Sequence, residues 1–361
     1  MAEELTNDTE KIVTSFRENL QYEAEDEDLL KAINAAMQES QGLKEKIDAI
    51  GKQNKLIWKQ GTAKDFTYWH PKRSRITSNR IFTDVETAIP ILTSESPEPT
   101  ILGVANNTLK ETLQKGLKYA YEVKYKLQQK LQQIIRHWFI FRLGVLKYRW
   151  DKEKQFVTEP VLVKKIGIDK QATSKENCEY IWELMEDTLE NLQAKFPLKN
   201  ETLKEITQGQ HPKTKLQYIE FWGGGGEWVC WKIRNIILAK KKNPNYNYEQ
   251  KESNLFDKPQ FPYLFLNVFN IGDETGLYDE TSLIEEAAPL QEGINQLEQQ
   301  ILDLNEGQKR VWVAAGEAIS EKKAQDLVDK TGDLMVYLDR KATPNSVTQV
   351  QSGKPDASLF Q

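Results

Sequence analysis

A run of apolar residues at alternating intervals of four and three positions constrains the fold of this chain more than any other feature. The run occupies Leu283, Ala287, Leu290, Ile294, Leu297, Ile301 and Leu304. A heptad repeat of this kind predicts a long α-helix that packs side by side with other helices at a shallow angle. Ser282 and Glu285 have the spacing of an N-terminal capping box, and Pro289 either kinks the helix or marks where its regular part begins.

The remaining face of this helix is polar and acidic. It carries Glu292, Glu298 and Asp303 among several glutamines, and no basic residue occurs from 281 to 308. Two interpretations remain open: the apolar positions form an interface between copies of the chain, or they pack inside an ordinary domain of one chain.

Helical patterns dominate the first 141 residues. Acidic residues at 25–28 precede the apolar positions that begin at Leu29, which is the charge order favoured at a helix N-terminus. A second helix is expected over about 77–92, followed by a loop with two prolines at 94–99. A single long helix with an apolar stripe is expected over about 108–141.

From Gly144 the apolar period changes towards two, which predicts strands. Strands are expected over 145–150, 156–166, 180–185, 218–222 and 228–234, and short helices over 190–196 and 201–207. Four glycines at 223–226 separate two aromatic-rich strands and predict a hairpin turn. The lysines at 240–242 precede Asn-Pro-Asn and are expected in a solvated loop. Long helices combined with antiparallel strands predict the α+β class.

Composition and motifs argue against an enzyme. The 361 residues carry 49 basic and 54 acidic side chains, a net charge of -5, which does not suit a protein that grips DNA phosphates tightly. Glu227 and Trp228 follow the glycine run, so it lacks the lysine and hydroxyl of a phosphate-binding loop. The three histidines lie far from one another and from Cys178 and Cys230. We therefore expect reduced thiols, no catalytic residues, no metal and no cofactor. No apolar run is long enough to span a membrane, so no membrane contact is expected.

Four segments, in order along the chain, carry a resemblance to a known family. They are NRIFTDVETAIPILTSESPEP (79–99), YIEFWGGGGEWVCWK (218–232), the block that ends in YDETSLIEEAAPLQEGINQLEQQILDLN (256–305), and RVWVAAGEAISEKKAQDLVDKTGDLMVYLDR (310–340). Their order and type resemble the portal proteins of tailed bacteriophages, the connectors between head and tail. The resemblance covers most of the chain, and the 256–305 block is its most specific part.

The resemblance implies a non-enzymatic ring subunit. The implied parts are an N-terminal helical region (1–105), a wing domain (106–275), a stem helix (276–308), a clip (309–350) and the start of a second stem helix (351–361), where the chain stops. The heptad positions would then be contacts in a homo-oligomer, commonly a dodecamer. Glu292, Glu298 and Asp303 would face the channel, where an acidic wall repels DNA phosphates and lets DNA slide. The ring would assemble in the bacterial host cytoplasm and occupy one vertex of the virion head. Implied partners are double-stranded DNA in the channel, the terminase large subunit, neck or adaptor proteins, and the major capsid or scaffold protein.

The clip is expected to be a small strand–helix–strand module. Its strands would lie at 311–313 and 334–338, with a helix over 319–328 between them. Lys309, Arg310 and Trp312 are the candidate docking residues, and Trp312 is the expected anchor because aromatic side chains dominate interface energetics. A second interpretation is that Trp312 fills the small core of the module.

The alternative function is a monomeric phage α/β enzyme or nuclease. In that case the helix over 281–305 would lie in the core of its own domain. What covers the heptad positions therefore discriminates between the two functions.

Overall fold

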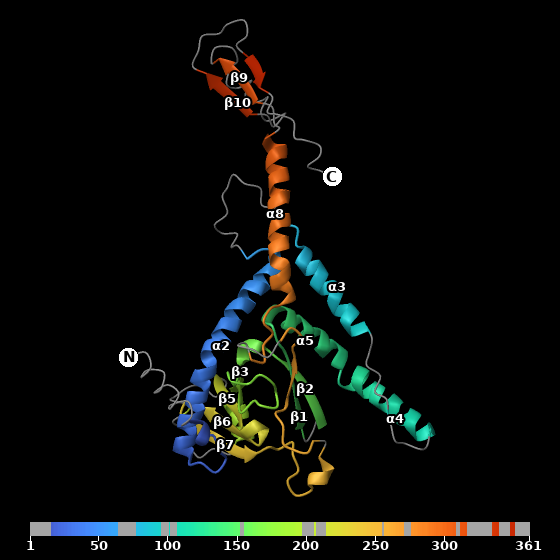
Figure 1. Cartoon of the computed structure of the whole chain (residues 1–361), viewed down its shortest axis with the longest axis vertical. Helices are drawn as coiled ribbons and strands as arrows, with labels where there is room; N and C mark the ends of the chain where they lie inside the picture. The colour runs from blue at the N-terminus through green and yellow to red at the C-terminus, as the bar shows by residue number, and fades with distance from the viewer. Residues whose placement is uncertain are drawn as a thin grey trace. The chain divides into compact units, whose positions relative to one another are not determined.

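The protein has the α+β fold class that the sequence predicts (Figure 1). The computed structural model describes residues 16–63, 77–94, 101, 107–151, 155–196, 206, 214–254, 256–270, 276–307, 311–315, 334–338 and 347–350. The chain forms two compact units, one of residues 1–59 and 81–287, the other of residues 60–80 and 288–361. The boundary between the units falls inside helix α8.

The first unit contains most of the helices. They are α2 (Asp26–Gln60), α3 (Arg80–Ser94), α4 (Asn107–Tyr119), α5 (Leu127–Phe141) and α6 (Leu189–Lys195). The first turn of α2 contains Asp26, Glu27 and Asp28, as expected from the favourable interaction of carboxylates with a helix N-terminus. The predicted second helix is α3, with Pro90 inside it.

The prediction of one continuous helix over 108–141 is wrong. Helix α4 ends at Tyr119, a π-helical turn spans Ala120–Lys124, and the Tyr125 N–H donates to the Ala120 carbonyl. Lys126 then adopts a left-handed conformation with φ 49° before α5 begins. A π turn holds more residues than an α turn, so it rotates one part of an apolar stripe relative to the other. Consequently α5 buries Ile134 and Trp138, whereas α4 buries no residue.

Two antiparallel sheets complete the first unit. One has the order β2-β1-β8, formed by β1 (Gly144–Asp151), β2 (Gln155–Val161) and β8 (Tyr263–Leu266). The other has the order β3-β4-β5-β6-β7, formed by β3 (Ile166–Ile168), β4 (Ile181–Thr188), β5 (Lys215–Gly223), β6 (Trp228–Ile233) and β7 (Ile236–Lys242). Every neighbouring pair within these two sheets is antiparallel.

The glycine run forms the hairpin turn between β5 and β6, as predicted. Gly224, Gly225 and Gly226 all have positive φ, the region that favours glycine. A Cβ on Gly226 would lie 2.5 Å from the backbone of Gln260 and Phe261, so the turn also requires the absence of a side chain. The run is therefore explained by the close approach of a neighbouring loop.

The predicted solvated loop at Lys240–Lys242 is wrong, because these lysines end strand β7. The apolar residues Ile236–Leu238 start the strand, and pairing with β6 continues from Cys230↔Lys240 to Trp228↔Lys242. Strand β7 is at the edge of its sheet, and lysines on an edge strand discourage pairing with another chain.

Helix α2 packs in the same cores as the sheets. Its Ile47 joins Val145, Val161 and Trp222 in one cluster of buried residues. Its Leu29, Ala32, Ile33 and Ala36 pack with Tyr180, Phe221 and Trp228 in a second cluster. The segment that the sequence assigns to an N-terminal helical region thus contributes α2 to the compact unit that holds the sheets.

Helix α8 (Leu283–Gly307) is the helix that the heptad pattern predicts. It begins in the first unit and continues in the second, which also contains a sheet. Strands β9 (Val311–Ala315), β10 (Leu334–Leu338) and β11 (Val347–Val350) form a sheet of order β10-β9-β11. The two predicted clip strands are confirmed as β9 and β10, and they pair in parallel. Trp312 lies in the central strand, with Met335 and Gln349 as its backbone neighbours. Lys309, Arg310, the helix expected over 319–328 and residues 351–361 lie outside the described residues.

Candidate oligomer interface on helix α8

The start of α8 is fixed by a network of hydrogen bonds within the first unit. The Glu285 N–H donates to Ser282 Oγ at 3.2 Å, and the Ser282 hydroxyl donates to Glu285 Oε1 at 2.9 Å. Arg142 Nε and Asn54 Nδ2 each donate to Glu285 Oε1 at 2.9 Å. Burial alone would raise the pKa of the Glu285 carboxyl, but the bonds from Arg142, Asn54 and Ser282 outweigh burial and lower that pKa.

Within the second unit, the buried face of α8 is polar. Gln291 and Asn295 are only 2% and 3% exposed. Gln291 Nε2 donates to the Ser78 carbonyl at 2.5 Å, and its Oε1 accepts from the Arg80 N–H at 3.0 Å. Asn295 Nδ2 donates to the Gly61 carbonyl at 2.8 Å. These two amides therefore satisfy backbone groups on both sides of the connection between α2 and α3.

The heptad positions, in contrast, are uncovered. We call Leu283, Ala287, Leu290, Ile294, Leu297 and Ile301 the leucine stripe. Leu290 is 73% exposed and Leu297 is 60% exposed, and every residue of the stripe is exposed or half-buried. The side chain of Leu304 lies outside the described residues. A helix packed in its own domain buries its apolar face and exposes its amides. In the second unit, helix α8 instead buries the amides of Gln291 and Asn295 and exposes Leu290 and Leu297.

The predicted channel-facing carboxylates divide between two sides of α8. At about 100° per residue, Glu298 lies roughly 60° from the centre of the leucine stripe, and Glu292 roughly 180°. Both side chains are half-buried, and the side chain of Asp303 lies outside the described residues. Glu298 Oε2 is enclosed and has no hydrogen-bond partner among the described residues. The helical period thus puts Glu298 at the border of the stripe.

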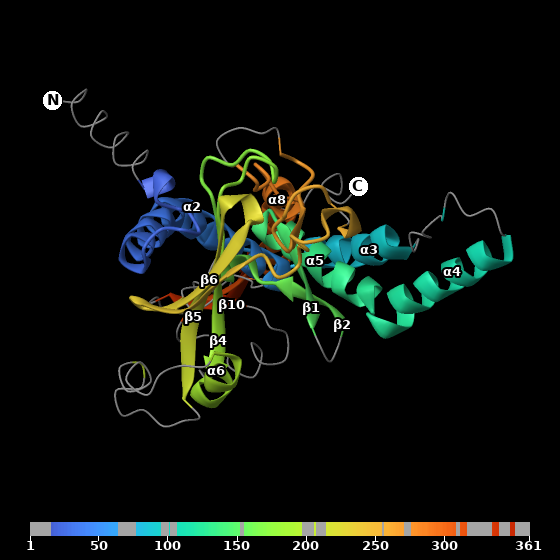
Figure 2. The same cartoon turned by 90° about the horizontal axis from the view of Figure 1, so that it is seen from below.

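Helix α4 carries a second exposed apolar stripe. Leu109, Leu113 and Leu117 recur at intervals of four residues, and all three are exposed. Helix α4 extends away from both sheets of the first unit (Figures 1 and 2). The sequence assigns these leucines to the buried stripe of one long helix. The π turn, which the sequence does not signal, is the reason they remain outside the core.

A buried ionic cluster lies inside the first unit, and sequence reasoning missed it. Lys147 Nζ lies 2.7 Å from Glu183 Oε2 and 2.7 Å from Glu220 Oε1. Tyr263 donates to Glu183 Oε2 at 2.9 Å, and Trp222 and Trp231 donate to Glu220. Burial would lower the pKa of Lys147, but the two carboxylates outweigh burial and raise it. Lys147, Glu183 and Glu220 are all buried, and their opposite charges partly neutralise one another inside the first unit. Two clefts in the described part of the chain have other lining residues.

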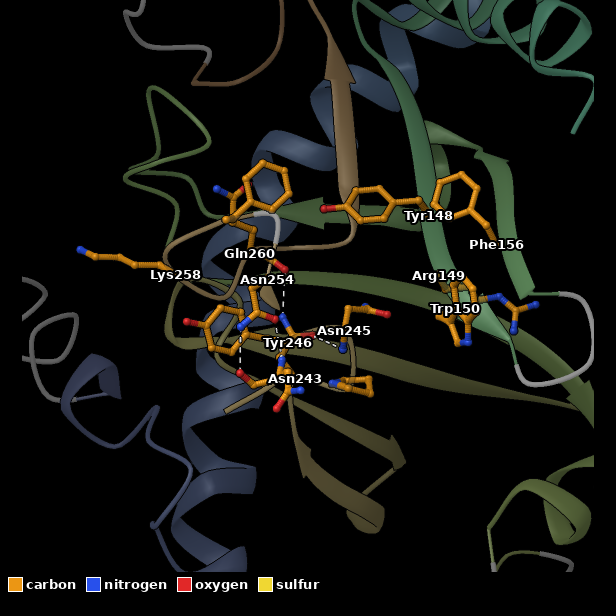
Figure 3. A pocket seen from close by; sticks show the side chains of 13 residues that line it. Tyr148, Arg149, Trp150, Phe156, Asn243, Asn245, Tyr246, Asn254, Lys258 and Gln260 are labelled. Carbon is orange, nitrogen blue, oxygen red and sulfur yellow. Dashed lines mark hydrogen bonds between the residues drawn. The ribbon is translucent and has the colours of Figure 1, made fainter. Parts of the chain in front are cut away.

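The larger of these clefts is about 1030 Å³ in volume and lies between β1 and the loop that follows β7 (Figure 3). Aromatic residues line it together with Arg149, Lys258 and several amides. The side chains of Asn243, Asn247 and Asn254 brace the loop through hydrogen bonds with its backbone. No Asp, Glu, His or Cys is among the lining residues. This lining suits stacking and hydrogen bonding, and its titratable side chains are those of Tyr148, Arg149, Tyr246 and Lys258.

The two cysteines are free and buried. Burial raises the pKa of the Cys178 thiol far above its usual value and that of Cys230 to about 12, so both remain protonated thiols near neutral pH. Among the residues that the structure describes, no group of His, Cys, Asp and Glu could hold a metal ion. In the same residues, no helix is long and apolar enough to span a membrane.

No model of a protein family matches this chain, and no curated protein matches it.

Proposed function

We propose that this chain is a subunit of the portal ring of a tailed bacteriophage, the ring through which DNA enters and leaves the virion head. The resemblance of residues 256–305 to the portal stem supports this proposal. In that interpretation α8 is the stem helix and the sheet β10-β9-β11 belongs to the clip. The subunit performs no catalysis; packaging is driven by a separate terminase that docks on the clip.

The single observation that carries the proposal is the orientation of α8. The helix buries Gln291 and Asn295 and exposes Leu290 and Leu297. Exposed apolar residues in a contiguous stripe mark a surface that another molecule covers. A ring satisfies this requirement because each copy offers the same stripe to a neighbour.

The charge of α8 supports the same proposal. Residues 283–302 contain four glutamates and no lysine or arginine. A channel lined by such helices repels phosphates, so double-stranded DNA slides without a salt-dependent grip. We propose Glu292 and Asp303, which share one side of the helix by its period, as the channel-facing carboxylates, with Glu298 at the edge of the interface.

Docking of the terminase large subunit and of neck or adaptor proteins is assigned to the clip, with Lys309, Arg310 and Trp312 as the candidate residues. Trp312 belongs to the central strand of its sheet. The major capsid or scaffold protein would surround the ring at the head vertex.

The alternative, a monomeric phage enzyme or nuclease, places the helix over 281–305 in its own core. That placement requires other parts of the same chain to cover Leu290 and Leu297. The exposure of both leucines favours the ring over this alternative.

The mass and shape of the purified particle test the proposal. Native mass spectrometry and negative-stain imaging of the whole chain should give closed rings of one stoichiometry with a central opening. A monomer at every concentration from about 1 to 100 μM would contradict the proposal. Steady ATP turnover or DNA cleavage that survives re-purification would support the enzyme instead.

A further inference from the structure

The chain carries two exposed apolar stripes on two different helices. One is the leucine stripe of α8, with Leu290 and Leu297 at its most exposed positions. The other is the stripe of α4, formed by Leu109, Leu113 and Leu117. Since none of the residues of α4 is buried, the interior of the first unit does not explain why α4 is amphipathic.

The two helices have opposite charge. Residues 107–126, which comprise α4 and the turn after it, contain five lysines and two glutamates, a net charge of +3. Residues 283–302 of α8 contain four glutamates and no basic residue, a net charge of -4. At about 100° per residue, Lys110 lies roughly 60° from the centre of the α4 stripe, and Glu298 borders the α8 stripe at the same angle. Each stripe thus has a charge of opposite sign at its edge.

The α4 stripe is long enough to cover the most exposed part of the leucine stripe. Leu109 to Leu117 covers eight residue steps, about 12 Å along the helix axis at 1.5 Å per residue, whereas the leucine stripe from Leu283 to Ile301 covers about 27 Å. The part from Leu290 to Leu297 is about 10 Å long, so two helices that pack side by side at a shallow angle can bury it against the α4 stripe.

We propose that α4 of one copy packs against the leucine stripe of α8 in a second copy of this chain, with Lys110 facing the acidic border of that stripe. The contact joins different surfaces of identical chains, so repetition around an axis closes a ring. This pairing rests on the proposed ring, and it identifies α4 of the neighbouring copy as the surface that covers α8. A contact between two α8 helices would instead bring carboxylates of like charge together.

Chemical cross-linking tests this pairing. The chain with both Leu113→Cys and Leu297→Cys is treated with a short bismaleimide at neutral pH. Because Cys178 and Cys230 are buried and protonated, the wild-type chain should give no product. We expect a ladder of dimers and larger multimers on a denaturing gel for the double variant, and only monomers for each single variant.

In each control pair, one of the two cysteines is moved to the side of its helix that faces away from the apolar stripe. Leu113→Cys combined with Gln296→Cys, and Lys115→Cys combined with Leu297→Cys, should give no ladder. A second pair, Leu117→Cys with Ile294→Cys, repeats the test about one turn away on each helix. Each variant is accepted only if its unfolding midpoint equals that of the wild type.

Five outcomes would overturn the pairing. Dimers from Leu297→Cys alone would show that α8 packs on α8, and dimers from Leu113→Cys alone would show that α4 packs on α4. A cross-linked monomer from the double variant would place α4 on its own α8. Rings in negative stain without a ladder from either pair would reject this pairing and leave the ring intact, whereas absence of both rings and ladder would reject the ring as well.

Discussion

The side-chain amide of Gln291 donates a hydrogen bond to Asn295 Oδ1, 2.9 Å away, on the buried side of α8. This pair lies one helical turn apart and orients both amides towards backbone groups at Gly61, Ser78 and Arg80. Because the amides occupy the buried side, the leucines of the heptad pattern face outwards. The exposure of the leucine stripe is therefore a consequence of this polar pair.

Replacing Asn295 with alanine should loosen the connection between α2 and α3. The substitution removes the hydrogen bonds of Asn295 with the Gly61 carbonyl and with the Gln291 amide. Losing a partner of a buried polar group lowers the free energy of unfolding by about 1–3 kcal/mol. Hydrogen exchange at residues 77–80 should accelerate, and the unfolding midpoint in urea should fall. Gln296→Ala, on the exposed side of the same helix, is the matched control and should change neither. Equal exchange rates in wild type and Asn295→Ala would show that the amides do not hold this connection.

Replacing both Leu290 and Leu297 with aspartate should abolish association without unfolding the subunit. Both side chains are exposed, so the free energy of unfolding should change by no more than ~0.5 kcal/mol. In an interface the same aspartates would be desolvated, and at ~1.4 kcal/mol per tenfold we expect at least a roughly 100-fold weaker association constant. Light scattering measures the particle mass. Gln296→Asp with Gln300→Asp adds the same charge to exposed positions of α8 away from the stripe, and this variant should still assemble.

Removing Lys147 should strongly destabilise the first unit. Lys147→Met leaves the Glu183 and Glu220 carboxylates buried side by side without a cation, and breaking a buried ion pair in this way costs about 3–5 kcal/mol. Adding Glu183→Gln and Glu220→Gln to the same chain should recover part of that loss, because the uncompensated charge disappears. Thermal unfolding compares the three proteins. A triple variant no more stable than Lys147→Met would contradict the assignment of the loss to charge.

The Glu285 carboxyl should make the protein less stable in acid. A carboxyl whose pKa is lowered by folding stabilises the folded protein above its unfolded pKa, which is about 4.3. That contribution is lost as the pH falls through the lower, folded pKa. The urea midpoint of Glu285→Gln should therefore be below that of the wild type at pH 7, and the gap should narrow between about pH 5 and pH 3. Glu286→Gln, an exposed carboxylate on the same turn, is the control. A gap that stays constant with pH would contradict the role of this carboxyl.

Local sequence predicted several of these elements, because their determinants lie within a few residues. Ser282, Glu285 and the heptad spacing suffice to start α8 and to set its period. The four glycines suffice to predict the turn between β5 and β6. The parts that failed depend on distant contacts. The partners of Gln291 and Asn295 are more than 200 residues away, so the sequence did not reveal which face of α8 is buried. The cluster around Lys147 likewise unites residues from five strands.

The break between α4 and α5 is a local feature, but the sequence did not predict it either. No proline or glycine lies between Tyr119 and Leu127, and the apolar residues continue at helical intervals. A π turn and a left-handed Lys126 nevertheless separate the two helices. Since neither has a distinctive residue pattern, periodicity alone could not place the break.

Because of this break, substitutions on α4 and substitutions in the core of the subunit have different consequences. Because α4 contributes no buried residue to the subunit, mutations on its surface leave folding stability nearly unchanged. Its leucines and lysines can therefore diverge at little cost to the monomer, provided that the surface they recognise diverges with them. If the proposed ring forms, such paired divergence would keep each kind of subunit among its own copies, and the specificity of assembly would evolve independently of the fold.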